Sequence, residues 1–118
     1  MSSYYSVPTK NTMLDSITVN KISLHTDNPG ATGAANEYAG TGYARQDCVF
    51  AAAADGKRLL DECVIFSGDE TDSISWLGFW AGSTFKGAAS AAGTTTFDEC
   101  GLLMVLKEDT YLSIEDET

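Results

Sequence analysis

The sequence predicts an all-β protein: a small antiparallel β-sandwich, jelly-roll-like, with an extended N-terminal arm. About six to eight short apolar segments recur roughly every ten residues, with turn residues between them, which is typical of sandwiches and small barrels. No amphipathic pattern is long enough for a core helix. The 118 residues fit one domain, so we assign residues 1–15 to the arm, 16–114 to the sandwich and 115–118 to an acidic C-terminal tail.

The arm is polar and aromatic by turns. Tyr4 and Tyr5 precede a proline, which favours extended backbone. A short helical turn capped by Thr9 or Asn11 is the alternative. We expect the two tyrosines to dock on a partner, because exposed aromatic rings serve no packing purpose in a mobile tail.

Several segments show the apolar alternation or clustering of strands. They span residues 16–25, 43–50, 59–66, 73–81, 102–106 and 110–114, with shorter edge strands expected within 82–93 and at 94–97. The first segment changes parity near residue 20, which predicts a bulge or a bend. Asp55-Gly56 predicts a tight hairpin turn.

The segment 73–81 is apolar on both faces, which implies burial on both sides or a second partner. Together with the tyrosines of the arm, its bulky side chains are our candidates for a protein interface. These candidates are Tyr4, Tyr5, Trp76, Phe79 and Trp80.

The charge balance argues against several classes of partner. There are 7 Lys+Arg against 17 Asp+Glu, a formal net charge of −10, and the cations are scattered. Neither nucleic acid nor an anionic membrane surface suits such a chain, and no apolar run approaches the ~20 residues of a membrane span. The acidity indicates either simple solubility or a partner with a basic surface. Three cysteines without a close pair, and a start unlike a signal peptide, predict synthesis in a reducing cytoplasm.

No residues indicate a cofactor or an enzyme. His25 is the single histidine and has Asp27 two residues later, but no nucleophile motif accompanies them, so a hydrogen-bonded structural histidine is the favoured interpretation. The acidic turn at Asp69–Asp72 could hold a calcium ion, although a solvated turn is more typical of such a segment.

The most specific feature is residues 24–46, LHTDNPGATGAANEYAGTGYARQ. Its proline and glycines predict tight turns, and we expect Glu37 and Arg45 to pair across the glycine stretch and hold the loop against a strand. A self-packed loop and a rigid contact surface are equally compatible with this pattern. Its structural residues are His25, Asp27, Pro29, Gly30, Gly33, Glu37, Gly42, Tyr43, Arg45 and Gln46.

This segment resembles a family of small virion proteins of tailed phages, in which a strand ends in L-H-T-x-x-P-G-x-x-G and N-E-x-x-G-x-x-Y-x-R-Q follows. Downstream of the segment the similarity is weaker. Members of this family are commonly labelled virion or tail-fibre proteins, and some small phage β-sandwiches act as capsid cement. The resemblance implies a structural role and carries no catalytic residues.

Our main functional hypothesis is therefore a capsid decoration or cement protein on the outside of the phage head. It would contact the major capsid protein, stabilise subunit junctions and act as a homodimer or homotrimer. One alternative is a phage tail or tail-fibre component. Another is a carbohydrate-binding adhesin module, in which exposed Trp76, Trp80 or Tyr38 would stack on sugars.

Overall fold

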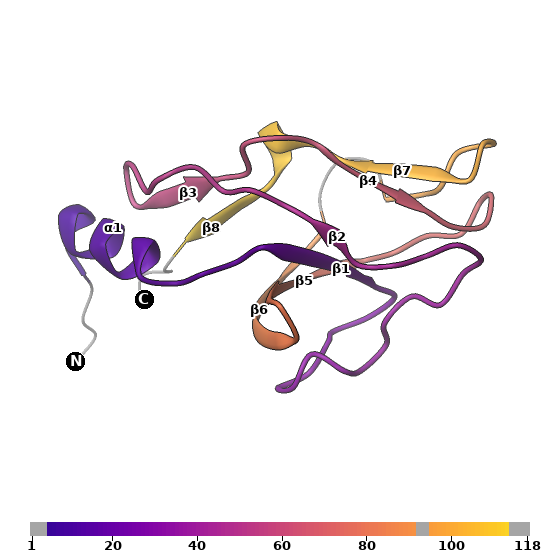
Figure 1. Ribbon diagram of the computed structural model, residues 1–118, viewed down its shortest axis with the longest axis horizontal. Coiled ribbons are helices and arrows are strands. Elements are labelled where there is room, and N and C mark those ends of the chain that lie inside the picture. Colours follow the sequence, from indigo (N-terminus) through magenta and orange to yellow (C-terminus); the bar gives the residue numbers. More distant parts are fainter. Residues whose placement is uncertain (1–4, 92–94, 114–118) are drawn as a thin grey trace.

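The structure is a computed structural model that describes residues 5–91 and 95–113. Short strands dominate it, together with one short α-helix and one 3-10 turn (Figure 1). The elements are α1 (Val7–Asp15), β1 (Lys21–His25), β2 (Gln46–Asp47), β3 (Lys57–Leu59), β4 (Val64–Ser67), β5 (Trp76–Ala81), β6 (Thr84–Ser90), β7 (Leu102–Val105), η1 (Lys107–Asp109) and β8 (Tyr111–Ser113). The all-β class predicted from the sequence is confirmed.

Two layers make up the fold. One is a four-stranded antiparallel sheet in the order β2-β1-β5-β6. The other consists of two antiparallel ribbons, β3–β8 and β4–β7, which lie end to end over one face of that sheet (Figure 1). The second layer is thus two separate ribbons and not one continuous sheet.

The hydrophobic core fills the space between these layers. From the sheet, Ile22 and Leu24 of β1 lie opposite Phe79 and Leu77 of β5, and all four are buried. Alternate residues of the β4–β7 ribbon point into the same core, as period-two alternation requires. They are Val64, Phe66, Leu103 and Val105.

The strands are shorter than the segments predicted from the sequence. The segment 59–66 is divided between β3, which ends at Leu59, and β4, which begins at Val64. Between them, Leu60 donates to the Thr110 carbonyl and forms an isolated bridge with Phe50. The predicted turn is present: Asp55 and Gly56 have φ of 53° and 76°, positive at both central positions as a type I′ turn demands. The strand β5 is buried on both faces, as its apolar pattern predicted.

The extended N-terminal arm is a correction, because residues 7–15 form helix α1. Ser6 caps it by accepting a hydrogen bond from the Thr9 N–H. The helix is nine residues long and buries only Leu14, too little for an amphipathic pattern to show. Contacts from distant residues hold it in place: Arg58 donates to the carbonyl oxygens of Leu14 and Ile17, and Asn11 accepts from the Gly56 N–H.

Several predictions fall partly or wholly outside the described residues: Tyr4 of the arm, the acidic tail at 115–118, and parts of the segments 82–93, 94–97 and 110–114. Within residues 5–91 and 95–113, no helix is both long and apolar enough to cross a membrane. The division of the chain into arm, sandwich and tail stays a prediction, apart from the helix that replaces the extended arm.

Candidate functional site

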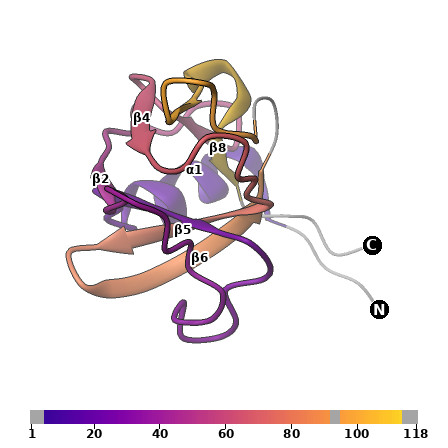
Figure 2. The same cartoon turned by 90° about the vertical axis from the view of Figure 1, so that its right-hand side faces the viewer.

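We call residues 26–45 the motif loop. Part of it covers the face of the four-stranded sheet that points away from the ribbons (Figure 2), whereas its residues Tyr38 and Tyr43 pack against the core. The loop approaches the sheet closely at Gly33, where an added Cβ would overlap the Phe85 ring. Gly33 also has a φ of 75°, which L residues rarely adopt. The glycine is therefore required both for the turn and for the contact.

A buried chain of hydrogen bonds lies between the loop and the sheet. The Trp80 indole N–H donates to Ser23 Oγ over 2.8 Å, and Ser23 Oγ lies 2.7 Å from His25 Nε2. His25 Nδ1 lies 2.8 Å from the carbonyl oxygen of Ala35 in the loop. Because that oxygen can only accept, Nδ1 carries the hydrogen, and the Ser23 hydroxyl donates to Nε2. We call Ser23, His25 and Trp80 the polar network.

Gly78 makes room for this network. It lies opposite Ser23 on the neighbouring strand, and a Cβ there would overlap Ser23 Oγ and lie 2.9 Å from His25 Nε2. Neither Ser23 nor Gly78 was singled out in the sequence. A serine and a glycine in strands are weak signals, and only the register of β1 against β5 brings them together.

The Ser23–His25 pair has the hydrogen bond of a hydrolase dyad, but a substrate could not reach it. Both residues are 0% exposed, and the serine oxygen is already occupied by the Trp80 donor. A backbone carbonyl orients Nδ1 in place of a carboxylate, since Asp27 bonds the Asn28 N–H instead. The histidine thus fastens the loop to the sheet, as the structural interpretation expected.

The predicted pairing of Glu37 with Arg45 is present and bidentate, with both N–O distances at 2.9 Å. The Tyr43 hydroxyl donates to Glu37 over 2.7 Å and accepts from the Leu24 N–H of β1. The hydrogen bonds from Arg45, and secondarily from Tyr43, outweigh partial burial and lower the pKa of Glu37 below its ordinary value of 4.5. Burial raises the pKa of Tyr43, so this hydroxyl keeps its proton.

Arg45 also joins the loop to the polar network. Its guanidinium carbon lies 3.6 Å from the centre of the Trp80 ring, a cation–π contact, and Phe85 packs edge-on against the same ring at 5.2 Å. Trp80 thus donates a hydrogen bond within the network and is covered by the loop. These contacts make the motif loop part of the folded core.

This arrangement corrects two of the predicted interface residues. Phe79 and Trp80 are 4% and 5% exposed, so they are interior side chains and present no surface to a partner. These bulky side chains of β5 suggested an interface, but the ribbons cover one of them, Phe79, and the motif loop covers the other, Trp80. Trp76 is partly buried, and Tyr5 is exposed.

The acidic turn at 69–72 is tied into the fold through the motif loop. The Tyr38 hydroxyl donates to Asp72 and accepts from the Asp69 N–H, and Asp69 in turn accepts from the Thr41 N–H. Tyr38 is 7% exposed and stacks on Phe97. Among the described residues, no three acidic, histidine or cysteine side chains are grouped closely enough to hold a metal ion.

The remaining motif residues shape the loop. Asp27 accepts from the Asn28 N–H, Pro29 is buried, and Gly30 and Gly42 have φ of 77° and 79°. Gln46 begins β2, and its side chain donates to the carbonyl oxygen of Ala44. Most of these residues therefore shape local turns, and Gln46 contributes to the pairing of β2 with β1.

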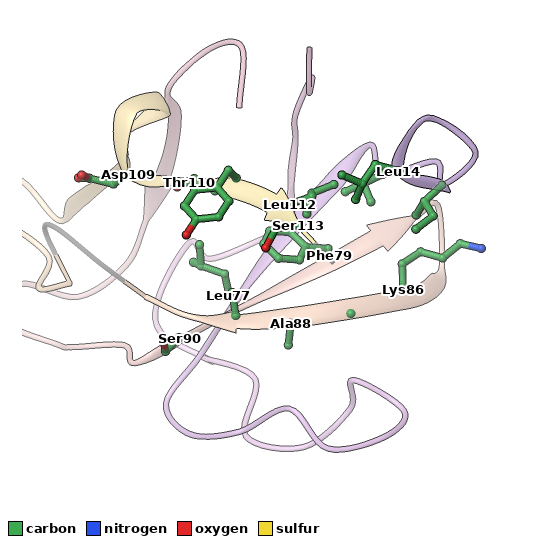
Figure 3. A pocket seen from close by; sticks show the side chains of 15 residues that line it. Leu14, Leu77, Phe79, Lys86, Ala88, Ser90, Asp109, Thr110, Leu112 and Ser113 are labelled. Carbon is green, nitrogen blue, oxygen red and sulfur yellow. The ribbon is translucent and has the colours of Figure 1, made fainter. Parts of the chain in front are cut away.

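A cleft of about 530 Å³ lies at the other end of the molecule, between the β5–β6 hairpin and the α1–β8 side (Figure 3). Leu77 and Phe79 line it from the sheet, and Leu14 and Leu112 line it from the opposite side. No sequence pattern predicted this cleft, because its walls come from five separate elements: α1, β5, β6, η1 and β8.

Comparison with known proteins finds a matching family. The model of a family described as "Podophage GP4 fiber I protein gp80" matches residues 7–99, from the start of α1 to the turn before β7. No curated protein and no solved structure matches the chain. The matched region includes the whole motif loop and the four-stranded sheet. The chain therefore belongs to the podophage GP4 fiber I protein gp80 family, and it is a phage virion structural protein.

Proposed function

We propose that this protein is a non-enzymatic structural component of the podophage fibre. The observation that carries the proposal is the family match over residues 7–99, which favours the tail-fibre alternative over capsid decoration. The partner would be another protein of the virion. Self-association into a symmetric oligomer remains part of the proposal, since fibres are extended assemblies of repeated contacts.

The packing of the motif loop supports a structural role. Among the described residues, no buried side-chain nitrogen or oxygen lacks a hydrogen-bond partner. A loop held by such a satisfied network is rigid, and a rigid scaffold loses little conformational entropy when it assembles. The inaccessible Ser23–His25 pair supports a role without catalysis.

The burial of aromatic rings argues against the adhesin alternative. Sugar stacking requires an exposed ring face, yet Tyr38 and Trp80 are 7% and 5% exposed. Trp76 keeps partial exposure and is the candidate that the adhesin hypothesis retains. An assembly role therefore accounts better for the arrangement of these side chains.

The test is the copy number per virion, measured by quantitative mass spectrometry of purified particles against the major capsid protein. A fibre component is expected in roughly a dozen copies or fewer, as a small closed oligomer on the tail. Immunogold labelling should then mark the tail end of the particle. Hundreds of copies on the head would favour capsid decoration and contradict the proposal, and absence from the particle would contradict both.

A further inference from the structure

The β4–β7 ribbon exposes apolar side chains on the face turned away from the core. Ile65 lies directly opposite Met104 in the ladder, and Leu102 lies two residues from Met104 on the same face. Their exposed fractions are 51%, 42% and 42% for Ile65, Leu102 and Met104. We call these three residues the outer patch. Adjacent exposed apolar groups on a two-stranded ribbon are typical of a surface that another protein covers.

Acidic side chains border this patch at both ends of the ribbon. They precede and follow β4 and precede β7, and all are exposed: Asp61, Glu62, Asp69, Glu70, Asp98 and Glu99. The ion pairs in the described part of the chain join other carboxylates, those of Asp15, Glu37 and Asp47. Among the described residues, no cation forms an ion pair with a carboxylate of the acidic rim.

Two cations that lie near the rim along the chain make other contacts. Lys57 lies over the Tyr111 ring, and Arg58 donates to backbone carbonyl oxygens beside α1. Lys107 is exposed beyond the end of β7. A partner that covered the outer patch without supplying positive charge would remove several carboxylates from water, at a cost in free energy.

We propose that the outer patch binds a different protein of the virion, one whose contact surface has an apolar centre bordered by lysine or arginine. Apolar burial at the centre supplies the attraction, and the opposite charges at the rim supply orientation and specificity. A second copy of this chain does not fit, because it would place the same acidic rim against the patch and carries a net charge of −10. The inference rests on the proposed function, which places the partner in the virion.

The experiment is a complementation of the phage that encodes this chain. Particles are grown with the gene deleted and the protein supplied from a plasmid, and copies per purified particle are counted by mass spectrometry. The double variant Ile65→Glu with Met104→Glu is expected to reduce incorporation at least tenfold, as loss of a central contact does. The control is Val7→Glu with Ile17→Glu, which changes two apolar residues of 47% and 37% exposure away from the ribbon and should leave incorporation unchanged.

A second pair of variants tests the charge. Glu70→Gln with Glu99→Gln removes two rim charges and is expected to lower incorporation severalfold. Asp27→Asn with Asp55→Asn changes the net charge equally, at exposed residues outside the rim, and should have no effect. If the rim acted only through overall solubility, both pairs of variants would change incorporation equally. That result would overturn the proposed role of the rim charges.

Other outcomes separate the possible explanations. Circular dichroism checks that each variant folds; if the glutamate pair does not, Ile65→Ser with Met104→Ser takes its place. Normal incorporation of the folded patch variants would overturn this inference while leaving the proposed function intact. Absence of the wild-type protein from particles would overturn the proposed function itself. Sedimentation that shows a wild-type dimer, abolished by the patch variants, would identify a second copy as the occupant and refute the proposal.

Discussion

The two faces of the four-stranded sheet are buried by different chemistry. On the core face, Ile22, Leu24 and Phe79 pack against apolar residues of the ribbons. On the other face, Ser23 and Trp80 form hydrogen bonds beneath the motif loop. Successive residues of β1 therefore alternate between an apolar layer and a polar one, although all residues from Ile22 to His25 are buried.

This difference determines how each face tolerates substitution. Apolar packing is non-directional, so a side chain of similar volume retains most of its contribution. A buried hydrogen-bond network contributes modestly to net stability, but breaking one member leaves the others unsatisfied. We therefore expect the stability cost of a core substitution to depend on the volume of the new side chain. In the polar network, we expect it to depend on whether the new side chain makes the same hydrogen bonds.

The largest effect is expected in the core. Phe66→Ala removes a ring that is 0% exposed and leaves a cavity, so we expect a loss of about 3–5 kcal/mol in the free energy of unfolding. Urea denaturation monitored by circular dichroism measures it. Ile65→Ala is the matched control on the adjacent position, where 51% exposure predicts a change within about 0.5 kcal/mol. Similar losses for both would contradict the assignment of faces in β4.

Gly78→Ala tests the polar face. The new methyl group would displace Ser23 Oγ and strain the network, which should cost about 2–4 kcal/mol by overpacking and lost hydrogen bonds. The same denaturation experiment applies. Gly87→Ala is the control, since Gly87 lies on β6 with open space at its Cβ position and its replacement should be neutral or slightly stabilising.

Arg45→Gln tests how firmly the loop is attached. It removes the bidentate bond to Glu37 and the contact with Trp80, so we expect a loss of about 1.5–3 kcal/mol, as for hydrogen bonds to charged groups. Lys21→Gln is the matched control. It breaks an ion pair to Asp47 whose side chains are 38% and 86% exposed, which predicts less than about 1 kcal/mol. Equal effects would show that the Arg45 contacts are as weak as a surface pair.

The sequence predicted the core face better than the polar face, for a physical reason. Apolar periodicity identifies buried strands locally, and it correctly indicated burial of β5 on both faces. The pair of Glu37 and Arg45 was also foreseeable, because opposite charges flank a glycine-rich loop. Helix α1 was expected only as an alternative, and with Thr9 or Asn11 as its cap instead of Ser6, because its stability comes from Arg58 and Asn11 contacts that are remote in sequence.

The polar network itself could not be predicted from the sequence. Ser23 meets His25 by alternation within one strand, but Trp80 joins them only through the register of β1 against β5. The same missing information made Trp80 look like an interface residue. A bulky aromatic residue on a strand indicates burial, and whether the cover is a partner or the chain's own loop depends on long-range contacts.

Because Glu37 must be charged to pair with Arg45, we expect the stabilisation that comes from this pair to depend on pH. Its pKa is lowered in the folded protein by the Arg45 and Tyr43 hydrogen bonds, so the unfolded chain binds this proton more readily. The stabilisation is therefore present above pH 4.5 and is lost as the pH falls below that value. Urea midpoints should show a deficit of Glu37→Gln relative to wild type at pH 7 that shrinks near pH 3. A deficit independent of pH would contradict the ion pair as its source.

The smallest effect concerns the cysteines, which lie in different environments. Cys48 is buried, and Cys63 and Cys100 are exposed. Burial, with a smaller contribution from Asp47, raises the pKa of the Cys48 thiol from 9.0 to about 11. Because the folded state holds this proton more tightly, the stabilisation is full below pH 9 and is lost between about pH 9 and 11.

At pH 8, a thiol reagent should label Cys63 and Cys100 of the native protein and reach Cys48 only after unfolding, since reaction requires an accessible thiolate. Rapid native labelling of Cys48, identified by peptide mass, would show that the chain just after β2 opens in the folded protein and would contradict the burial of this thiol.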